Sequence, residues 1–172
     1  MRLLGVLVLD PAAFEDIESD RGAAMQSVIL VVAVCLSGGF ALAGLGAAGP
    51  AGFATGAVMV LGSWLVWVTV IAALGTHVMA EPQTRSDLPE LLRVLGFAAA
   101  PGLFIGLAAM PAVMPLVVVV VAIWMVAAAV LGLRQALDYR GTTRAAAVCV
   151  ISWLLSFGVM AALATLFTQP VN

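Results

Sequence analysis

The chain has 172 residues, of which 64% are hydrophobic and 9% are charged, and its formal net charge is -2. Soluble domains carry about 25% charged residues, so this composition excludes a soluble globular protein and indicates a chain dissolved in lipid. The charge is mixed, with nine acidic residues against seven arginines, and therefore does not form the basic footprint of a nucleic-acid-binding protein.

Residues 1–22 are predicted to form an interfacial segment before the first apolar run. Asp10 is a favourable N-cap residue and Pro11 suits the first position of a helix, so a short helix should begin there. Phe14 and Ile17 would share one face of that helix. We expect the segment to lie along the cytoplasmic membrane surface before the chain enters the bilayer.

Five long apolar runs follow, and each is predicted to be a transmembrane helix. A helix needs about 17 to 25 apolar residues to cross a hydrocarbon core of about 30 Å. A backbone in lipid must also satisfy its own hydrogen bonds, which favours helices. The runs are residues 23–45, 56–79, 94–110, 116–133 and 145–167. The sequence therefore predicts an all-α polytopic membrane protein, with residues 1–172 forming a single five-helix bundle.

The second run ends near His77, the one histidine of the chain, for which there are two interpretations. A lone histidine on an apolar helix would be able to ligate haem or a chlorophyll-type pigment, and Ala73 one turn earlier would leave room for the macrocycle. Alternatively, His77 is an interfacial side chain that is hydrogen-bonded to Glu81 or to water. The second interpretation leaves the protein without a cofactor, which is our expectation.

The loop before the third run predicts a helix that continues directly into it. Asp87 is an N-cap candidate, and Glu90 follows three residues later, as in a capping box. Pro101 interrupts the run among small residues and is predicted to kink the helix. Gly102 and Gly106 lie one turn apart and would allow another helix to approach closely.

Arginine side chains at the helix ends are expected to find carboxylates. Arg93 lies at the membrane boundary, where an unpaired guanidinium is costly, so we expect it to pair with Asp10, Asp20 or Asp138. Arg134 and Asp138 lie four residues apart and are expected to pair on the last turn of the fourth helix. Gly141 is predicted to end that helix, with Thr142 or Thr143 capping the next.

Signatures of catalysis and ion transport are absent from the sequence. No Asp, Glu, Arg or Lys falls inside the five runs, which argues against an ion-coupled transporter. Glycine-rich phosphate loops, metal-ligand spacings and a convergent Ser-His-Asp set are also missing, so we expect no enzyme activity. Cys35 and Cys149 both lie within runs and are interpreted as small buried hydrophobic residues.

The arginines fall only in alternate gaps between the runs, which predicts the membrane orientation. By the positive-inside rule, the N-terminus lies in the cytoplasm and the C-terminus lies outside. The arginines are Arg2, Arg21, Arg85, Arg93, Arg134, Arg140 and Arg144.

Reporter fusions would test this orientation. A reporter that is active only in the cytoplasm should work at the N-terminus, and a reporter that is active only outside should work after residue 172. Both termini on one side would mean that a span had been miscounted, and the third run, the shortest and the one with a proline, is the first place to look.

Three stretches resemble the prokaryotic branch of the Yip family, five-span membrane proteins related to Ypt/Rab-interacting proteins. They are Asp10-Pro11 with Phe14, Ile17 and Asp20; Thr84-Arg85-Ser86 leading to Glu90-Leu91-Leu92-Arg93-Val94-Leu95-Gly96-Phe97-Ala98 and Pro101-Gly102; and Trp124 followed by Leu133-Arg134-Gln135-Ala136-Leu137-Asp138. The Asp-Leu-Tyr-Gly-Pro and Gly-Tyr-Gly signatures of the eukaryotic members are not found here, so Rab binding does not carry over.

The resemblance implies a non-enzymatic scaffold or adaptor in a bacterial cytoplasmic (inner) membrane, acting through its cytoplasmic face. Its expected partners are the lipid bilayer and other membrane proteins, including a larger complex, and not nucleic acid. The residues expected in a cytoplasmic cluster or partner contact are Asp10, Phe14, Asp20, Arg85, Arg93, Arg134, Gln135 and Asp138. Two alternatives stay open: an accessory subunit of an energy-transducing or photosynthetic complex, and a small-solute facilitator near the Pro101 break.

Overall fold

The computed structural model describes residues 2–46, 49–84 and 86–167, and within these ranges the chain is helical with no strand. Four segments are long and apolar enough to cross a membrane: α3 (Ala23–Gly44), α4 (Pro50–Ala73) with the short π-helix η1 (Leu74–Val78), α6 (Met114–Ala136) and α7 (Thr142–Phe167). A bent pair, α5 (Leu88–Ala98) and the 3₁₀ helix η2 (Ala100–Ala109), makes a fifth span if counted as one. The predicted all-helical membrane fold is confirmed.

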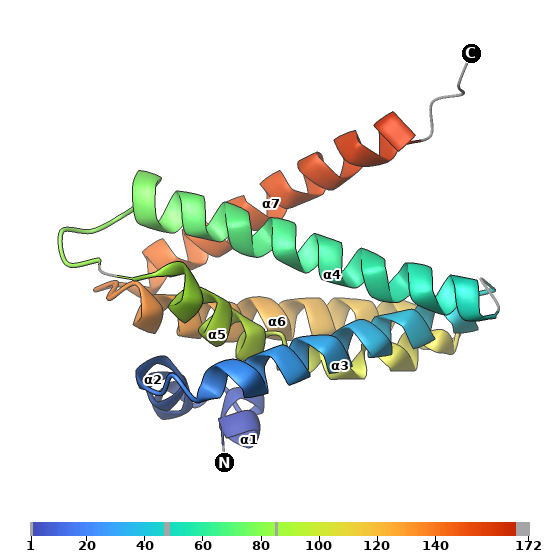
Figure 1. Ribbon diagram of the computed structural model, residues 1–172, viewed down its shortest axis with the longest axis horizontal. Coiled ribbons are helices and arrows are strands. Elements are labelled where there is room, and N and C mark those ends of the chain that lie inside the picture. Colours follow the sequence, from blue (N-terminus) through green and yellow to red (C-terminus); the bar gives the residue numbers. More distant parts are fainter. Residues whose placement is uncertain (1, 47–48, 85, 168–172) are drawn as a thin grey trace.

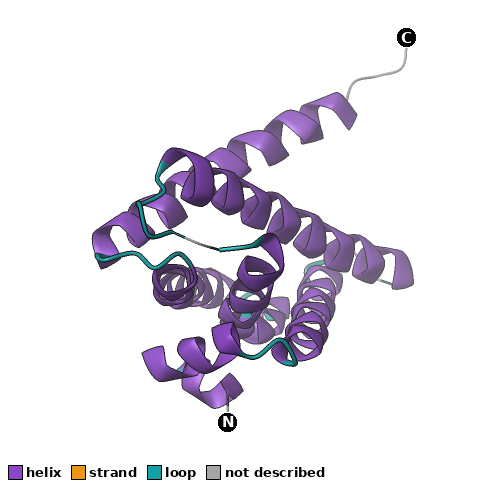
Figure 2. Ribbon diagram, turned by 60° about the vertical axis from the view of Figure 1, so that its left-hand side comes forward, coloured by secondary structure: helices purple, strands orange, loops and turns teal. Residues whose placement is uncertain are grey.

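The helices form a bundle from which the last helix diverges (Figure 1). Helix α3 packs against α4 and η2, and α6 packs against η2 and α5. Helix α7 packs against α4 and α6 near its start and then separates from both (Figure 1). Two short helices, α1 (Arg2–Leu7) and α2 (Pro11–Ser19), form a hairpin on the flank of the bundle near the start of α3 (Figure 2).

Helix α4 begins earlier than the sequence pattern predicted. The second apolar run was predicted to begin at residue 56, but residues 50–55 already form the first turns of α4. Pro50 occupies the first helical turn, where its missing N–H costs nothing. Gly49, with φ of 96°, supplies the left-handed turn before it. The helix therefore starts six residues before the predicted run.

The third span is broken rather than gently kinked. Helices α5 and η2 meet at an angle of 44°, and the break falls at Ala99, just before Pro101. A 3₁₀ helix rises about 2.0 Å per residue against about 1.5 Å in an α-helix. The ten residues of η2 therefore cover about 20 Å rather than about 15 Å. Counted as one span, the bent pair is thus longer than an α-helix with the same number of residues.

The glycines of η2 allow it to lie close against α3. A Cβ atom at Gly102 would come 2.7 Å from Cγ1 of Val34, and one at Gly106 would come 2.9 Å from Oγ of Ser37. The Ser37 hydroxyl donates to the Leu103 carbonyl at 2.8 Å and accepts from the Gly106 N–H at 2.9 Å. The small-residue pair therefore serves a contact within the chain.

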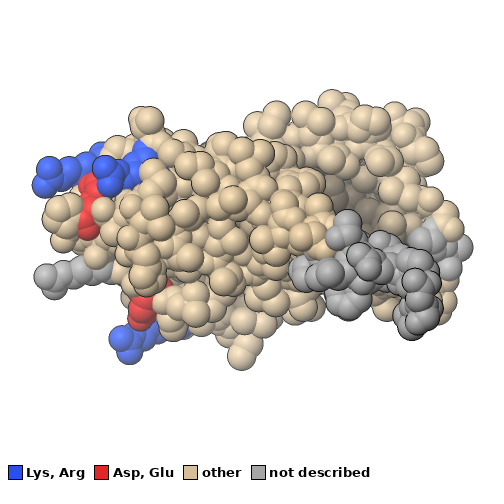
Figure 3. Space-filling view, turned by 90° about the horizontal axis from the view of Figure 1, so that it is seen from above, with Lys and Arg blue, Asp and Glu red and all other residues tan. Residues whose placement is uncertain are grey.

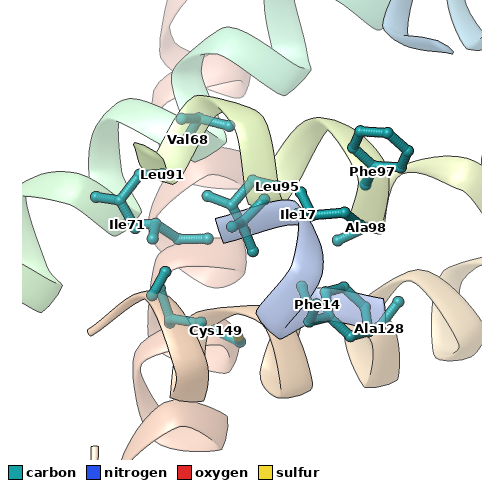
Figure 4. Packing of buried hydrophobic residues seen from close by; sticks show 14 of the residues in the cluster. Phe14, Ile17, Val68, Ile71, Leu91, Leu95, Phe97, Ala98, Ala128 and Cys149 are labelled. Carbon is teal, nitrogen blue, oxygen red and sulfur yellow. The ribbon is translucent and has the colours of Figure 1, made fainter. Parts of the chain in front are cut away.

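The buried core lies where α2, α5 and α6 meet (Figure 4). Phe14 and Ile17 of α2 are fully buried there, and Cys149 of α7 belongs to the same cluster. Cys35 and Cys149 are both buried free thiols, as predicted. The indole N–H of Trp124 donates to the Leu7 carbonyl at 3.0 Å and ties α1 to α6. The hairpin is thus packed into the bundle and not laid loosely on a surface.

Candidate interaction surface at the charged end

The charged residues gather at one end of the bundle, as Figure 3 shows for the face in view. We call this region the charged end, and it comprises residues 10–22, 79–84, 86–90 and 134–144. Arg2 and Arg93 lie beside it and connect it to the bundle. Arg85 lies outside the residues that the structure describes. Contacts of Arg2, Arg93 and Arg144 organise the charged end.

Arg2 holds the hairpin against the start of α3. Its guanidinium lies 2.7 Å from the carboxylates of both Asp16 and Asp20, and it donates to Gln26 at 3.5 Å. The hydrogen bond from Arg2 lowers the pKa of Asp16. The pKa of Asp20 is lowered most by the hydrogen bond from the backbone N–H of Gly22. The hydrogen bond from Arg2 lowers it further. Both carboxylates therefore stay ionised, and Asp20 is used within the chain.

Helix α2 is fixed by its own cap and by its apolar face. Asp10 accepts a hydrogen bond from the Ala12 N–H at 3.0 Å, which confirms it as the N-cap. Phe14 is fully buried, and a Cβ atom on Gly132 of α6 would come 3.1 Å from its ring. The structure thus places Phe14 in the packing between α2 and α6, away from any exposed contact.

Arg93 forms no ion pair with a carboxylate among the described residues, and the expectation of Asp10, Asp20 or Asp138 as its partner is wrong. Its side chain is buried, and its Nε and Nη2 atoms donate to the backbone carbonyls of Ile17 at 3.3 Å and Glu18 at 2.7 Å. These carbonyls belong to the last turn of α2, where they lack intrahelical donors and carry the negative end of the helix dipole. A helix C-terminus replaces the expected carboxylate.

A second set of contacts joins the segment after η1 to the turn before α7. Arg144 pairs with Glu81 at 3.2 Å and donates to the Met79 carbonyl at 3.2 Å. The Thr84 hydroxyl donates to the Leu137 carbonyl at 3.0 Å. Sequence reasoning did not find these contacts. The available signal was that Glu81 and Arg144 lie at the same end of neighbouring antiparallel spans.

The buried Tyr139 ties the same turn to the π-helix. Its hydroxyl donates to the Gly75 carbonyl at 2.9 Å, and burial raises its pKa. A residue this buried is unsuited to partner contact. Tyr139 thus acts as a structural link between the α6–α7 turn and the end of α4.

Arg134 and Asp138 do not pair as expected. Helix α6 ends at Ala136, and Asp138 adopts a left-handed conformation with φ of 52°, so helical i, i+4 geometry is lost. Asp138, and not Gly141, therefore marks the end of this helix. Thr142 is the first residue of α7 and not its cap. Arg134 is exposed and reaches Thr142 at 3.5 Å, while Gln135 is half-buried on the last turn of α6.

His77 is exposed within η1 and contacts Thr76 rather than Glu81. The Thr76 hydroxyl donates to the Ala72 carbonyl at 2.6 Å, so it accepts from Nδ1 of His77 at 2.7 Å. Nδ1 of His77 therefore acts as the donor in this contact, and Nε2 forms no hydrogen bond with the described residues. Among the described residues, no group of three or more His, Cys, Asp or Glu side chains could hold a metal ion.

Six carboxylates form no ion pair among the described residues. Four of them come from α2, α5 and the α6–α7 turn: Glu15, Glu18, Glu90 and Asp138. Burial raises the pKa of Glu18, and the charges of Glu90, Asp138 and Glu15, in that order, raise it further, against a smaller opposing effect of Arg93. Helix α2 packs against both α5 and α6, so these four acidic residues lie at the same end of the bundle, and we call them the acidic patch. Their mutual repulsion would be relieved by a cation.

A family model described as the Yip1 domain matches residues 4–163. The chain belongs to the Yip1 family. The match runs from the first turn of α1 into α7, so the Yip1 domain includes the hairpin, the acidic patch and the five apolar segments. Neither a curated relative nor a solved structure matches the chain. The match confirms the predicted membership of the Yip family.

Proposed function

We propose that this Yip1-family protein is a non-enzymatic scaffold of the bacterial cytoplasmic membrane that binds other membrane proteins through its charged end. The acidic patch is the observation that supports this proposal most directly. Glu15 and Asp138 are exposed, and no described arginine pairs with either of them. The other contacts of the charged end hold the elements that carry these carboxylates in a fixed arrangement.

The chemistry of the patch selects a basic partner. Cytoplasmic segments next to transmembrane helices are enriched in lysine and arginine. With the charged end in the cytoplasm, the acidic patch faces such segments on neighbouring membrane proteins, and complementary charge favours their encounter and orientation. The partner class is therefore a membrane protein with a basic juxtamembrane segment.

Site-specific photo-crosslinking in intact membranes tests the proposal. A crosslinker at Glu15 should capture a membrane protein, and the crosslinked peptide should carry several Lys or Arg residues. A crosslinker at Ala112, in the turn before α6 at the opposite end, should capture little. Added salt should weaken capture at Glu15, because exposed charges are screened.

A pair of charge-matched variants supplies the control. Glu18→Gln removes one negative charge from the patch and should reduce capture by the Glu15 crosslinker. Ala112→Lys changes the net charge equally at the opposite end of the bundle and should leave capture unchanged. Dominant capture from Ala112, or crosslinked peptides without basic residues, would overturn the proposal.

One observation favours a second candidate, an accessory subunit of a larger energy-transducing or photosynthetic complex. His77 is exposed and its Nε2 forms no hydrogen bond with the described residues, so this atom is available to a haem or pigment metal. An absorbance band in the visible range of the purified complex, lost in His77→Gln, would support this role. A colourless complex would exclude it. The facilitator has no such support, because Pro101 and its neighbours are buried.

A further inference from the structure

A groove of about 830 Å³ opens on the flank of the bundle between α1, the first half of α3 and the break between α5 and η2. Its two ends differ in chemistry. Arg2, Asp16 and Gln26 line one end and are joined by the hydrogen bonds described above. The remainder is apolar, with Leu30 and Ala33 among the lining side chains of α3.

The groove has a defined depth in the membrane. Gln26 lies in the first turn of α3, so Arg2, which contacts it, lies at the level where the first span begins. From Gln26 to Ala33 the helix advances about 10 Å. The apolar part of the groove continues along Phe97 of α5 and Leu103 of η2, which lie on either side of the break between these helices. The groove therefore begins at the membrane boundary and extends part of the way through one leaflet, which is about 15 Å thick in its hydrocarbon part.

We propose that this groove binds one acyl chain of a phosphatidylethanolamine molecule, with the phosphate near Arg2 and the ammonium near Asp16. The groove mouth is lined by Leu4 and Ile29, which are 57% and 62% exposed and face lipid in a bilayer. In a bilayer, lipid acyl chains therefore surround the mouth of the groove. A partner helix is excluded as the occupant because it is about 10 Å wide and crosses both leaflets, whereas the groove covers one.

The charges at the polar end select the headgroup. One guanidinium lies between two carboxylates, those of Asp16 and Asp20, so a purely anionic headgroup would meet more negative than positive charge. A zwitterionic headgroup satisfies both signs. The carboxylate of Asp16 is 58% exposed and free to accept further hydrogen bonds. An ammonium group donates such bonds, whereas the quaternary ammonium of phosphatidylcholine has no N–H to donate.

Native mass spectrometry with lipid competition tests this site on the full chain. The purified protein is offered equal amounts of phosphatidylethanolamine, phosphatidylcholine and phosphatidylglycerol with identical acyl chains. We expect the ethanolamine lipid to be retained about threefold to fivefold over the choline lipid, the effect of one exposed charged hydrogen bond. Equal retention of all three lipids, or a preference for phosphatidylglycerol, would overturn the proposal.

Two variants with matched controls separate the headgroup from the chain. Asp16→Asn keeps an acceptor for Arg2 but removes the charge, so the preference for ethanolamine over choline should disappear, whereas Glu15→Gln one residue earlier should preserve it. Ala33→Phe fills the apolar part and should reduce retention of every lipid. Val119→Phe, at a 54% exposed position on α6, should not. If Ala33→Phe retains lipid as the parent chain does, the groove is not the site.

Discussion

Replacing Arg93 with alanine is expected to lower the free energy of unfolding by about 3 kcal/mol. The side chain is 8% exposed and donates two hydrogen bonds to the last turn of α2. Without it, the carbonyls of Ile17 and Glu18 lose their donor at a site from which water is largely excluded. Hydrogen bonds that involve a charged group are also stronger than neutral ones. Denaturation in mixed micelles, followed by circular dichroism, measures the loss.

Two further variants show whether the loss of stability in Arg93→Ala comes from the position of the arginine or from its charge. Arg134→Ala removes an arginine that is exposed and makes only a 3.5 Å contact with Thr142, so its effect should stay within about 0.5 kcal/mol. Arg93→Lys keeps the charge, but a single ammonium on a different stem fits the two carbonyls less well than a planar fork, so stability should recover only in part. Equal losses for Arg93→Ala and Arg134→Ala would contradict this role of Arg93.

Local signals in the sequence predicted much of the fold. Hydropathy alone indicated the apolar segments, because a chain in lipid has few alternatives to the helix. Asp10 and Asp87 were recognisable as N-caps, since a cap depends on residues within one turn, and both accept the expected backbone hydrogen bonds. The gathering of charges at one end also follows from the order of apolar and polar segments (Figure 3).

Contacts between distant segments were not predictable in the same way. Arg93 and Ile17 are 76 residues apart, and a backbone carbonyl leaves no trace in the sequence that could identify it as a partner. The hydrogen bond from Tyr139 to the Gly75 carbonyl is hidden for the same reason. The pairing of Arg134 with Asp138 failed because the end of a helix depends on tertiary contacts, here those that hold the α6–α7 turn against the segment after η1.

For the glycine pair, the sequence predicted close packing but not the packing partner. Gly102 and Gly106 were recognisable as a surface for close packing, but such a pattern suits a neighbouring chain and a neighbouring helix equally. The structure gives the partner as α3, through Val34 and Ser37. The same contact accounts for the survival of a 3₁₀ segment in the membrane, because Ser37 satisfies one carbonyl and one N–H of η2.

Gly102→Ala is therefore expected to destabilise the protein by about 2 kcal/mol, the cost of adding a methyl group to a packed contact. The new Cβ would lie 2.7 Å from Cγ1 of Val34, a β-branched side chain that has little rotamer freedom in a helix. Either Val34 must leave its rotamer or η2 must move away from α3, which would weaken the Ser37 hydrogen bonds. Unfolding in mixed micelles measures the change.

Two further variants test this explanation: Val34→Ala removes the side chain that the new methyl group would meet, and Gly62→Ala adds the same methyl group at an open position. Val34→Ala should cost stability alone, but in combination with Gly102→Ala the total loss should fall below the sum of the two single losses by about 1 kcal/mol, because the added methyl occupies the space that is vacated. Gly62→Ala places the same methyl in α4, where nothing lies within 4 Å, and should be neutral or stabilising because alanine favours the helix. Strict additivity of the first pair, or an equal loss at Gly62, would show that the approach of η2 to α3 does not depend on glycine at this position.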